Sequence, residues 1–248
     1  MQRDVVSVRG APGLLRPLAL AAIAVVSWLA LGATASAGAA TPGSVIAAAK
    51  AAVATETGVH VLFVARAHST SKTEEIVADI GRTSGEETIT LGSARLAIRV
   101  TPSHGYASGN VSGLTTLFGL TPAQAKKAGS DWVTWKAGTT QYADLKADVT
   151  MTSVNALLPK ATGTKLSSKV TGGAQLFVLT STVPATGSTP ELSNKLTVSA
   201  TGATLPVEAT STESDGTNAT TTLSDWDEPV VVVAPATASS IAAAKVTG

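Results

Sequence analysis

The stretch from His104 to Leu145 constrains the fold most, because it sets two short capped helices between strand-like segments. Asn110 precedes the first helical segment, and Thr121 with Pro122 opens the second, which Gly129 ends. Asn and Thr are favoured N-cap residues, Pro is favoured at the first helical position, and Gly is favoured just past the last turn. This order predicts a curved sheet with helices laid across it.

Strand-like patterns fill most of the remaining sequence. Residues 59–67 are apolar on both faces, which is typical of a strand covered on both sides. Residues 96–100 alternate between apolar and polar side chains, as in a strand with one face toward water. Glycine and proline separate further expected strands at 175–181, 195–200, 204–210, 218–226 and 230–234. The pattern predicts an α+β meander of roughly nine to eleven strands, with helices on one face.

The N-terminal segment has the three parts of a secretory signal. Arginines precede an apolar run from Leu18 to Leu31, and the small residues that follow end in an Ala-Ser-Ala motif at Ala37. The apolar run is shorter than the ~20 residues that cross a bilayer comfortably. We therefore expect residues 1–37 to be removed and residues 38–248 to form one extracytoplasmic domain. An uncleaved segment would instead tether the protein to the membrane.

Composition excludes several classes of function. The 248 residues include no cysteine, which rules out disulfides, thiolate metal sites, cysteine nucleophiles and a lipid-modified cysteine anchor. Lysine and arginine are scattered and the formal net charge is +1, so the electrostatic footprint of a nucleic-acid-binding protein is missing. The abundance of alanine, threonine, serine and glycine resembles that of secreted proteins from high-GC actinobacteria.

No arrangement of residues predicts catalysis or metal binding. The histidines, His60, His68 and His104, lack the close spacing of a zinc site, and Ser103 beside His104 has no nucleophile elbow around it. We interpret the Glu86–Glu87 pair as a solvated strand end or turn rather than as a glycosidase pair. Asp225, Asp227 and Glu228 are spaced too loosely to predict a calcium site. We expect no enzyme activity, no cofactor and no metal.

Four segments in their shared order carry a resemblance to a known family. They are GYASGN, FGLTPAQAKKAGSDWVTW, QYADL and LSDWDEPVVVVAPATA. In this order they resemble the mycobacterial lipoproteins that carry lipids and lipoglycans through the cell envelope. The resemblance implies a curved antiparallel half-barrel sheet with helices packed on its concave face and an apolar cavity for acyl chains. The chain departs from the family at LGATASAG, where the lipobox cysteine would stand.

Two functional hypotheses follow. The first is a secreted lipid-binding or lipid/lipoglycan-transfer protein that holds acyl chains in the cavity, with peripheral or no membrane attachment. The second is a non-enzymatic cell-envelope interaction module with a filled core, whose partner is an envelope protein or transporter. A sheet packed tightly on the same helices has the same periodicity, so the pattern fits either hypothesis.

The expected cavity lining comes mainly from two helical stripes with apolar residues at offsets 0, 3, 6 and 7. The paired tryptophans of DWVTW lie three residues apart, so in a strand they point to opposite faces, and one of them is a further candidate. The alternative for every candidate is plain packing between helix and sheet. The candidates are Leu114, Leu117, Phe118, Trp132, Val154, Leu157 and Leu158.

Overall fold

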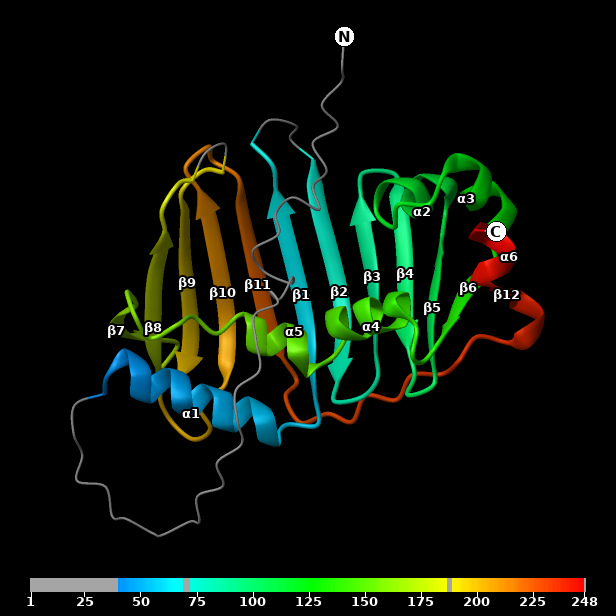
Figure 1. Cartoon of the computed structure of the whole chain (residues 1–248). Coiled ribbons are helices and arrows are strands. Elements are labelled where there is room, and N and C mark those ends of the chain that lie inside the picture. The colour runs from blue at the N-terminus through cyan, green and yellow to red at the C-terminus, as the bar shows by residue number, and fades with distance from the viewer. Residues whose placement is uncertain (1–39, 69–71, 187–188, 248) are drawn as a thin grey trace.

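The structure is a computed structural model that describes residues 40–247 apart from 69–71 and 187–188. The expected secretory segment, residues 1–37, lies outside the described residues. Twelve described strands form one open sheet (Figure 1). They are β1 (Gly58–Arg66), β2 (Thr73–Gly81), β3 (Gly85–Leu91), β4 (Ala94–Val100), β5 (His104–Gly109), β6 (Trp132–Lys136), β7 (Lys165–Thr171), β8 (Ala174–Val183), β9 (Leu192–Ser199), β10 (Pro206–Glu213), β11 (Asn218–Ser224) and β12 (Ser240–Ala242).

Two antiparallel meanders meet in the middle of this sheet. The strand order is β12-β6-β5-β4-β3-β2-β1-β11-β10-β9-β8-β7. Strand β1 pairs with β2 on one side and with β11 on the other, where His60 lies opposite Ser224. Only the three-residue strand β12 runs parallel to its neighbour, β6, among the described strands. The expected α+β fold with a curved, mostly antiparallel sheet is confirmed.

Helices α1, α5 and α4 lie in a row across one face of the sheet, and α2 and α3 lie at its upper right (Figure 1). No helix within the described residues combines the length and apolarity needed to cross a bilayer. The expected cap of α3 is confirmed, since Thr121 and Gln124 form a reciprocal capping box. The helices are α1 (Pro42–Thr55), α2 (Val111–Thr116), α3 (Pro122–Ala128), α4 (Thr140–Asp148), α5 (Met151–Ala156) and α6 (Ala243–Thr247).

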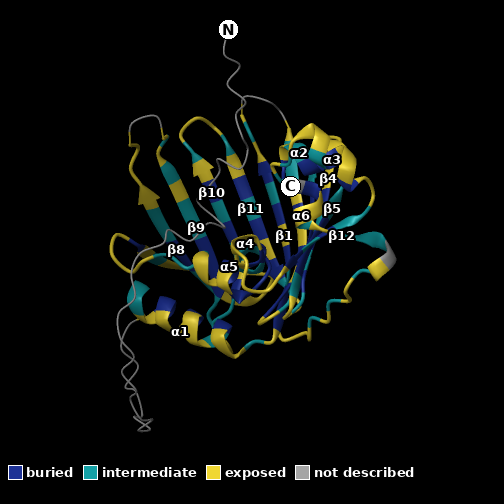
Figure 2. Cartoon of the chain, turned by 45° about the vertical axis from the view of Figure 1, so that its right-hand side comes forward, coloured by how far each residue is buried: buried dark blue, intermediate teal, exposed yellow. Residues whose placement is uncertain are grey.

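Alternation along the strands separates a buried face from an exposed one. In β1, Val61 and Phe63 are buried beneath the helices, whereas His60 and Leu62 point to the opposite face. Buried positions gather along β11 and β1, while the outer side of α1 is exposed (Figure 2). A second apolar cluster lies under α1, where Val45, Ile46 and Ala49 pack with Leu179, Leu196, Val198 and Ala209. Helix α1 therefore packs against the meander formed by β7–β11.

One expected strand is wrong. Residues 230–234 belong to no strand. They follow β11 in the chain but cannot pair with it, because β1 and β10 already pair with its two edges. Instead the C-terminal strap, residues 228–236, runs along the lower edge of the sheet toward β12 (Figure 1). Val231 and Val233 on this strap are 81% and 71% exposed. Four consecutive valines have a strong β propensity, but they form no strand here because the strands next to them are already paired with each other.

Candidate functional site

A small cavity lies between α5 and the concave face of the sheet. Its floor comes from inward-facing residues of β1, β2, β3 and β11, and its roof comes from α5 and from the end of α4. The cavity has a volume of about 20 Å³. Its lining is mostly aliphatic: Val61, Phe63, Ile76, Ala78, Ile80, Glu87, Asp148, Ser153, Val154, Leu157 and Thr221.

Cross-strand register builds the apolar floor. Phe63 lies between Ile76 of β2 and Thr221 of β11, and Val61 lies opposite Ala78. Because the side-chain period of a strand is two, these residues all face the helices. Opposed apolar side chains of this kind are the unit that stabilises a sheet. The floor is therefore fixed by the same contacts that hold the sheet together.

The roof is held less firmly than the floor. Helix α5 has only six residues and no side-chain hydrogen bond at its N-cap residue, Thr150, whose hydroxyl donates to the carbonyl of Lys146 at 2.7 Å. Val154 is 1% exposed, and Leu157, just past the helix, packs on both apolar clusters. A helix this short has little stability of its own. Helix α5 therefore depends on these apolar contacts for its position.

Two carboxyl groups line the apolar cavity. Glu87 comes from β3 and is 6% exposed, and Asp148 is the last residue of α4. The interpretation of Glu87 as solvated is wrong, because its side chain points to the same buried face of β3 as that of Ile89. Its neighbour Glu86 points to the opposite face, where Oε2 lies 2.9 Å from Nε of Arg99. The alternation around Ile89 was the signal in the sequence that could have placed Glu87 in the interior.

The cavity is much smaller than an ordinary ligand pocket. Pockets that hold small ligands typically measure about 300–1,000 Å³. A volume of about 20 Å³ has room for roughly one water molecule. The space is therefore too small for an acyl chain as the structure stands.

The predicted lining residues fall in three places. Val154 and Leu157 line the cavity, and Leu158 packs against the cluster under α1. Leu114 and Leu117 are buried in the main core, around α2. They lie outside the lining of the cavity.

The aromatic candidates also lie away from the cavity. Phe118 contacts the ring of Trp135, with centroids 5.2 Å apart. Trp132 and Trp135 do face opposite sides of β6, and Trp135 is the buried one. The guanidinium of Arg99 lies over the ring of Trp132, 4.9 Å from its centroid. Trp132 therefore lies on the other face of the sheet, against Arg99.

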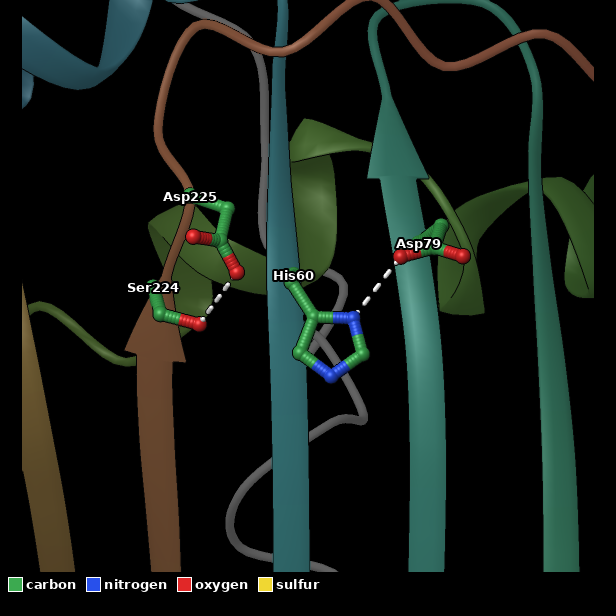
Figure 3. Close-up of polar contacts among 4 residues, drawn as sticks. All are labelled: His60, Asp79, Ser224 and Asp225. Atoms are coloured by element: carbon green, nitrogen blue, oxygen red, sulfur yellow. Dashed lines mark hydrogen bonds and ion pairs between the residues drawn. The ribbon is translucent and has the colours of Figure 1, made fainter.

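A second, polar hollow of about 300 Å³ lies on that other face, beside the C-terminal strap. Nδ1 of His60 lies 2.8 Å from Oδ1 of Asp79, and the Ser224 hydroxyl donates to Asp225 at 2.9 Å (Figure 3). These are two separate pairs. No three histidine or carboxylate side chains among the described residues are placed to hold a metal ion. The hollow therefore offers polar walls without a recognisable catalytic or metal centre.

Comparisons with known proteins bear on the fold. No protein-family model matches the chain, and no curated protein matches it. The chain is similar to solved structures of mycobacterial lipoproteins. LppX of Mycobacterium tuberculosis is 18% identical, with 77% of this chain and 99% of that chain covered and a TM-score of 0.48. LprF of Mycobacterium bovis is 17% identical, with 79% and 97% covered and a TM-score of 0.48.

A further match is MucB, solved in complex with MucA(peri), at 14% identity. It covers 79% of this chain and 58% of that chain, with a TM-score of 0.34. The similarity to mycobacterial lipoproteins that the sequence predicted is confirmed. At these scores the similarity identifies no ligand, so the chemistry of the site has to come from this chain's own residues. Those residues offer apolar contact and two carboxyl groups.

Proposed function

We propose that this protein is a secreted lipid carrier that binds acyl chains between α5 and the concave face of the sheet. The observation that carries this proposal is the aliphatic cavity beneath a short helix that apolar contacts hold in place. The ligand is a lipid or the acyl part of a lipoglycan. The protein binds and releases it without forming a covalent bond.

Partitioning supplies the binding energy. Each methylene that leaves water for an apolar environment contributes about 0.8 kcal/mol. Some of this energy is spent in lifting Val154 and Leu157 from the floor. The ligand then replaces the contacts that these two side chains make in the closed state. Closed and open states therefore differ mainly in which apolar groups cover β1 and β2.

The cell envelope is the proposed place of action. Residues 1–37 act as the secretory signal, and residues 38–248 form the single domain that is released. The absence of cysteine removes the usual lipid anchor of a bacterial lipoprotein, which leaves peripheral or no membrane attachment. A freely diffusing carrier exchanges its ligand with an envelope protein or transporter.

The small size of the cavity favours a second candidate function. A volume of about 20 Å³ also suits a filled core, in which the same fold acts as an envelope interaction module without a lipid. The two candidates differ in one observable property, which is the presence of a bound lipid.

Native mass spectrometry of the secreted protein separates these candidates. A carrier should show a discrete added mass that organic extraction recovers as lipid, either directly or after incubation with lipids of the host. A bare mass under both conditions would contradict the carrier and favour the interaction module.

Two adjacent leucines provide a matched pair of variants. Leu157 lines the cavity and is partly exposed, whereas Leu158 packs only against the cluster under α1. We expect Leu157→Asp to lose lipid retention, because it places a charge in the apolar site. Leu158→Asp should retain the added mass. Far-UV circular dichroism checks that both variants are folded, and equal retention by the two would contradict the proposed site.

A further inference from the structure

The C-terminal strap, residues 228–236, presents exposed valines beside the polar hollow. Val231 and Val233 are 81% and 71% exposed, and Val231 also lines the hollow of about 300 Å³. We propose that the strap and the hollow together bind an extended segment of a partner protein, which lies along the valines and places a lysine or arginine side chain in the hollow. The hollow lies on the opposite face of the sheet from the apolar cavity, so this inference goes beyond the carrier function.

The strap is fixed to the lower edge of the sheet but pairs with none of its strands (Figure 1). Val230 packs against Gly58, where an added Cβ would overlap the valine side chain, and its carbonyl accepts from the Ser84 hydroxyl at 3.4 Å. Within the described residues, the N–H groups of Val231 and Val232 make no backbone hydrogen bond. The strap thus has a fixed position and keeps main-chain donors for another chain.

Carboxyl groups outnumber basic side chains around the hollow. Its lining includes one histidine and four acidic residues: His60, Asp79, Glu86, Asp225 and Glu228. Two of the acids have cationic or ionisable partners, since His60 contacts Asp79 at 2.8 Å and Arg99 contacts Glu86 at 2.9 Å. Asp225 and Glu228 form no ion pair with a described residue. The remaining negative charge therefore lies next to the exposed valines.

The acidic side chains are spread along the hollow rather than gathered at one point. Asp225 and Asp79 lie on either side of His60 (Figure 3). This spacing does not suit a metal ion, in agreement with the absence of a metal-binding group among the described residues. A guanidinium carries five N–H donors in a planar fork, and an ammonium carries three. Either group on a long side chain can contact separated carboxylates.

Strand addition explains how the strap and the hollow act together. Pro229 and Pro235 bound the four valines, and the residue before a proline favours an extended backbone. An added strand gains affinity from main-chain hydrogen bonds and specificity from pockets that accept particular side chains. Because side chains alternate along an extended peptide, one can enter the hollow while others contact Val231 and Val233. An acidic side chain at the same position would meet like charge.

Peptides that differ at one position test this inference. Three fluorescent peptides of alternating valine and threonine carry arginine, citrulline or glutamate at the centre, and fluorescence anisotropy measures their binding to the purified protein. Citrulline keeps the shape of arginine without its charge. We expect the arginine peptide to bind about tenfold more tightly than the citrulline peptide, and the glutamate peptide to bind most weakly. Added salt should reduce the advantage of arginine.

Variants of the protein separate the two parts of the site. Glu228→Gln should reduce the preference for arginine, whereas Glu75→Gln, which removes the same charge from an exposed position of β2 outside the hollow, should leave it unchanged. Val231→Ser combined with Val233→Ser should weaken all three peptides alike. Val170→Ser on β7 is the control, because this valine is also exposed, at 68%. Circular dichroism checks that each variant is folded.

Equal affinity for the arginine and glutamate peptides, or no binding of any of the three, would overturn the inference. Self-association of the full chain that the two valine substitutions abolish would assign the strap to a second copy and would also overturn it. Lipid retention by these variants, measured by native mass spectrometry, should equal that of the parent. Failure to bind peptide with lipid retained would therefore reject this inference alone, and the reverse result would reject only the carrier function.

Discussion

Single residues decide how closely the elements of this fold approach one another. Gly113 in α2 lies directly against the backbone of Arg95 at the start of β4. A Cβ atom at this position would overlap the carbonyl oxygen of Arg95. The Asn110 side chain fixes the same contact, since Oδ1 accepts from the N–H of Gly113 at 2.7 Å and Nδ2 donates to Ser93. The close packing of helix α2 against β4 thus requires glycine at position 113.

We predict that Gly113→Ala lowers the free energy of unfolding by about 1–3 kcal/mol, the usual cost of overpacking. The gain in helix propensity is smaller than this loss. Urea unfolding followed by circular dichroism measures the change. Gly43→Ala in α1 is the control, because its added Cβ would lie 3.8 Å from Cβ of Ala161, an ordinary contact. Equal effects at both glycines would contradict the prediction.

Glu213 gives stability a weak dependence on pH. Partial burial, together with the nearby charge of Asp215, raises the pKa of the Glu213 carboxyl above its ordinary value. The folded state therefore binds a proton more tightly than the unfolded state does. Stability from this residue is greatest below the ordinary pKa and falls as the pH rises through the raised pKa.

Accordingly, Glu213→Gln should be slightly more stable than the parent near neutral pH. The stabilities of the two proteins should become equal as the pH falls below the ordinary pKa of glutamate. The effect should be about a few tenths of a kcal/mol, because water screens this partly exposed group. Thermal unfolding at several pH values tests the trend. A difference in stability between the two proteins that grows toward acidic pH would contradict the raised pKa of Glu213.

At the scale of elements, α5 is the segment that has to move if the site is to open. The chain contains no cysteine, so a single introduced thiol reports on that motion without interference. Val154 is 1% exposed, whereas the adjacent Asn155 is exposed. Burial slows the reaction of a thiol to the rate at which its segment opens.

We predict that Val154→Cys reacts slowly with a thiol reagent and that Asn155→Cys reacts at once. Lipid should change the rate at position 154 and leave the rate at position 155 unchanged. Mass spectrometry of the labelled protein over time provides both rates. Rapid labelling of Val154→Cys without lipid would mean that α5 is already open in solution.

Elements with a local signal could be predicted from the sequence, and elements set by distant contacts could not. The alternation of Leu96, Ile98 and Val100 predicted β4, and the cap at Thr121 predicted α3, because both depend on neighbouring residues. Helix α4 was missed, since it buries only Tyr142 and Leu145. The strand expected at residues 230–234 failed because its neighbours in space were unknown.

The candidate site was less predictable than the fold. Helical spacing indicated that Val154 and Leu157 face inward, but spacing does not show which cluster a side chain joins. Leu114 has the same spacing and belongs to the same apolar cluster as Val154, yet it does not line the cavity. The volume left between packed side chains depends on the distances between elements, which no local pattern specifies.

The whole molecule has two unequal sheet edges. At one edge, β12 and α6 follow β6, and Val246 of α6 is 2% exposed. At the other edge, β7 is largely exposed and carries Lys165 and Lys169. Lysines on an edge strand discourage pairing with another chain. One edge is therefore covered by the chain itself, and the other is protected by charge.

We predict that removal of residues 240–248 promotes self-association, because it uncovers the edge of β6. Size-exclusion chromatography with light scattering over a range of concentrations measures this effect. Val246→Ala is the control, since it weakens the core and keeps β12 in place. A truncated chain with the molar mass of the full chain at every concentration would contradict the role assigned to β12.

The central pairing of β1 with β11 also sets the order in which the molecule can fold. Strand β1 pairs locally with β2, but its other partner forms only when residues 218–224 are available, and α1 likewise packs on strands from the second meander. Closing so long a loop costs entropy before the contact stabilises anything, and non-local pairing of this kind slows folding. A chain threaded through a membrane from its N-terminus would thus stay incompletely folded until almost all of it had crossed.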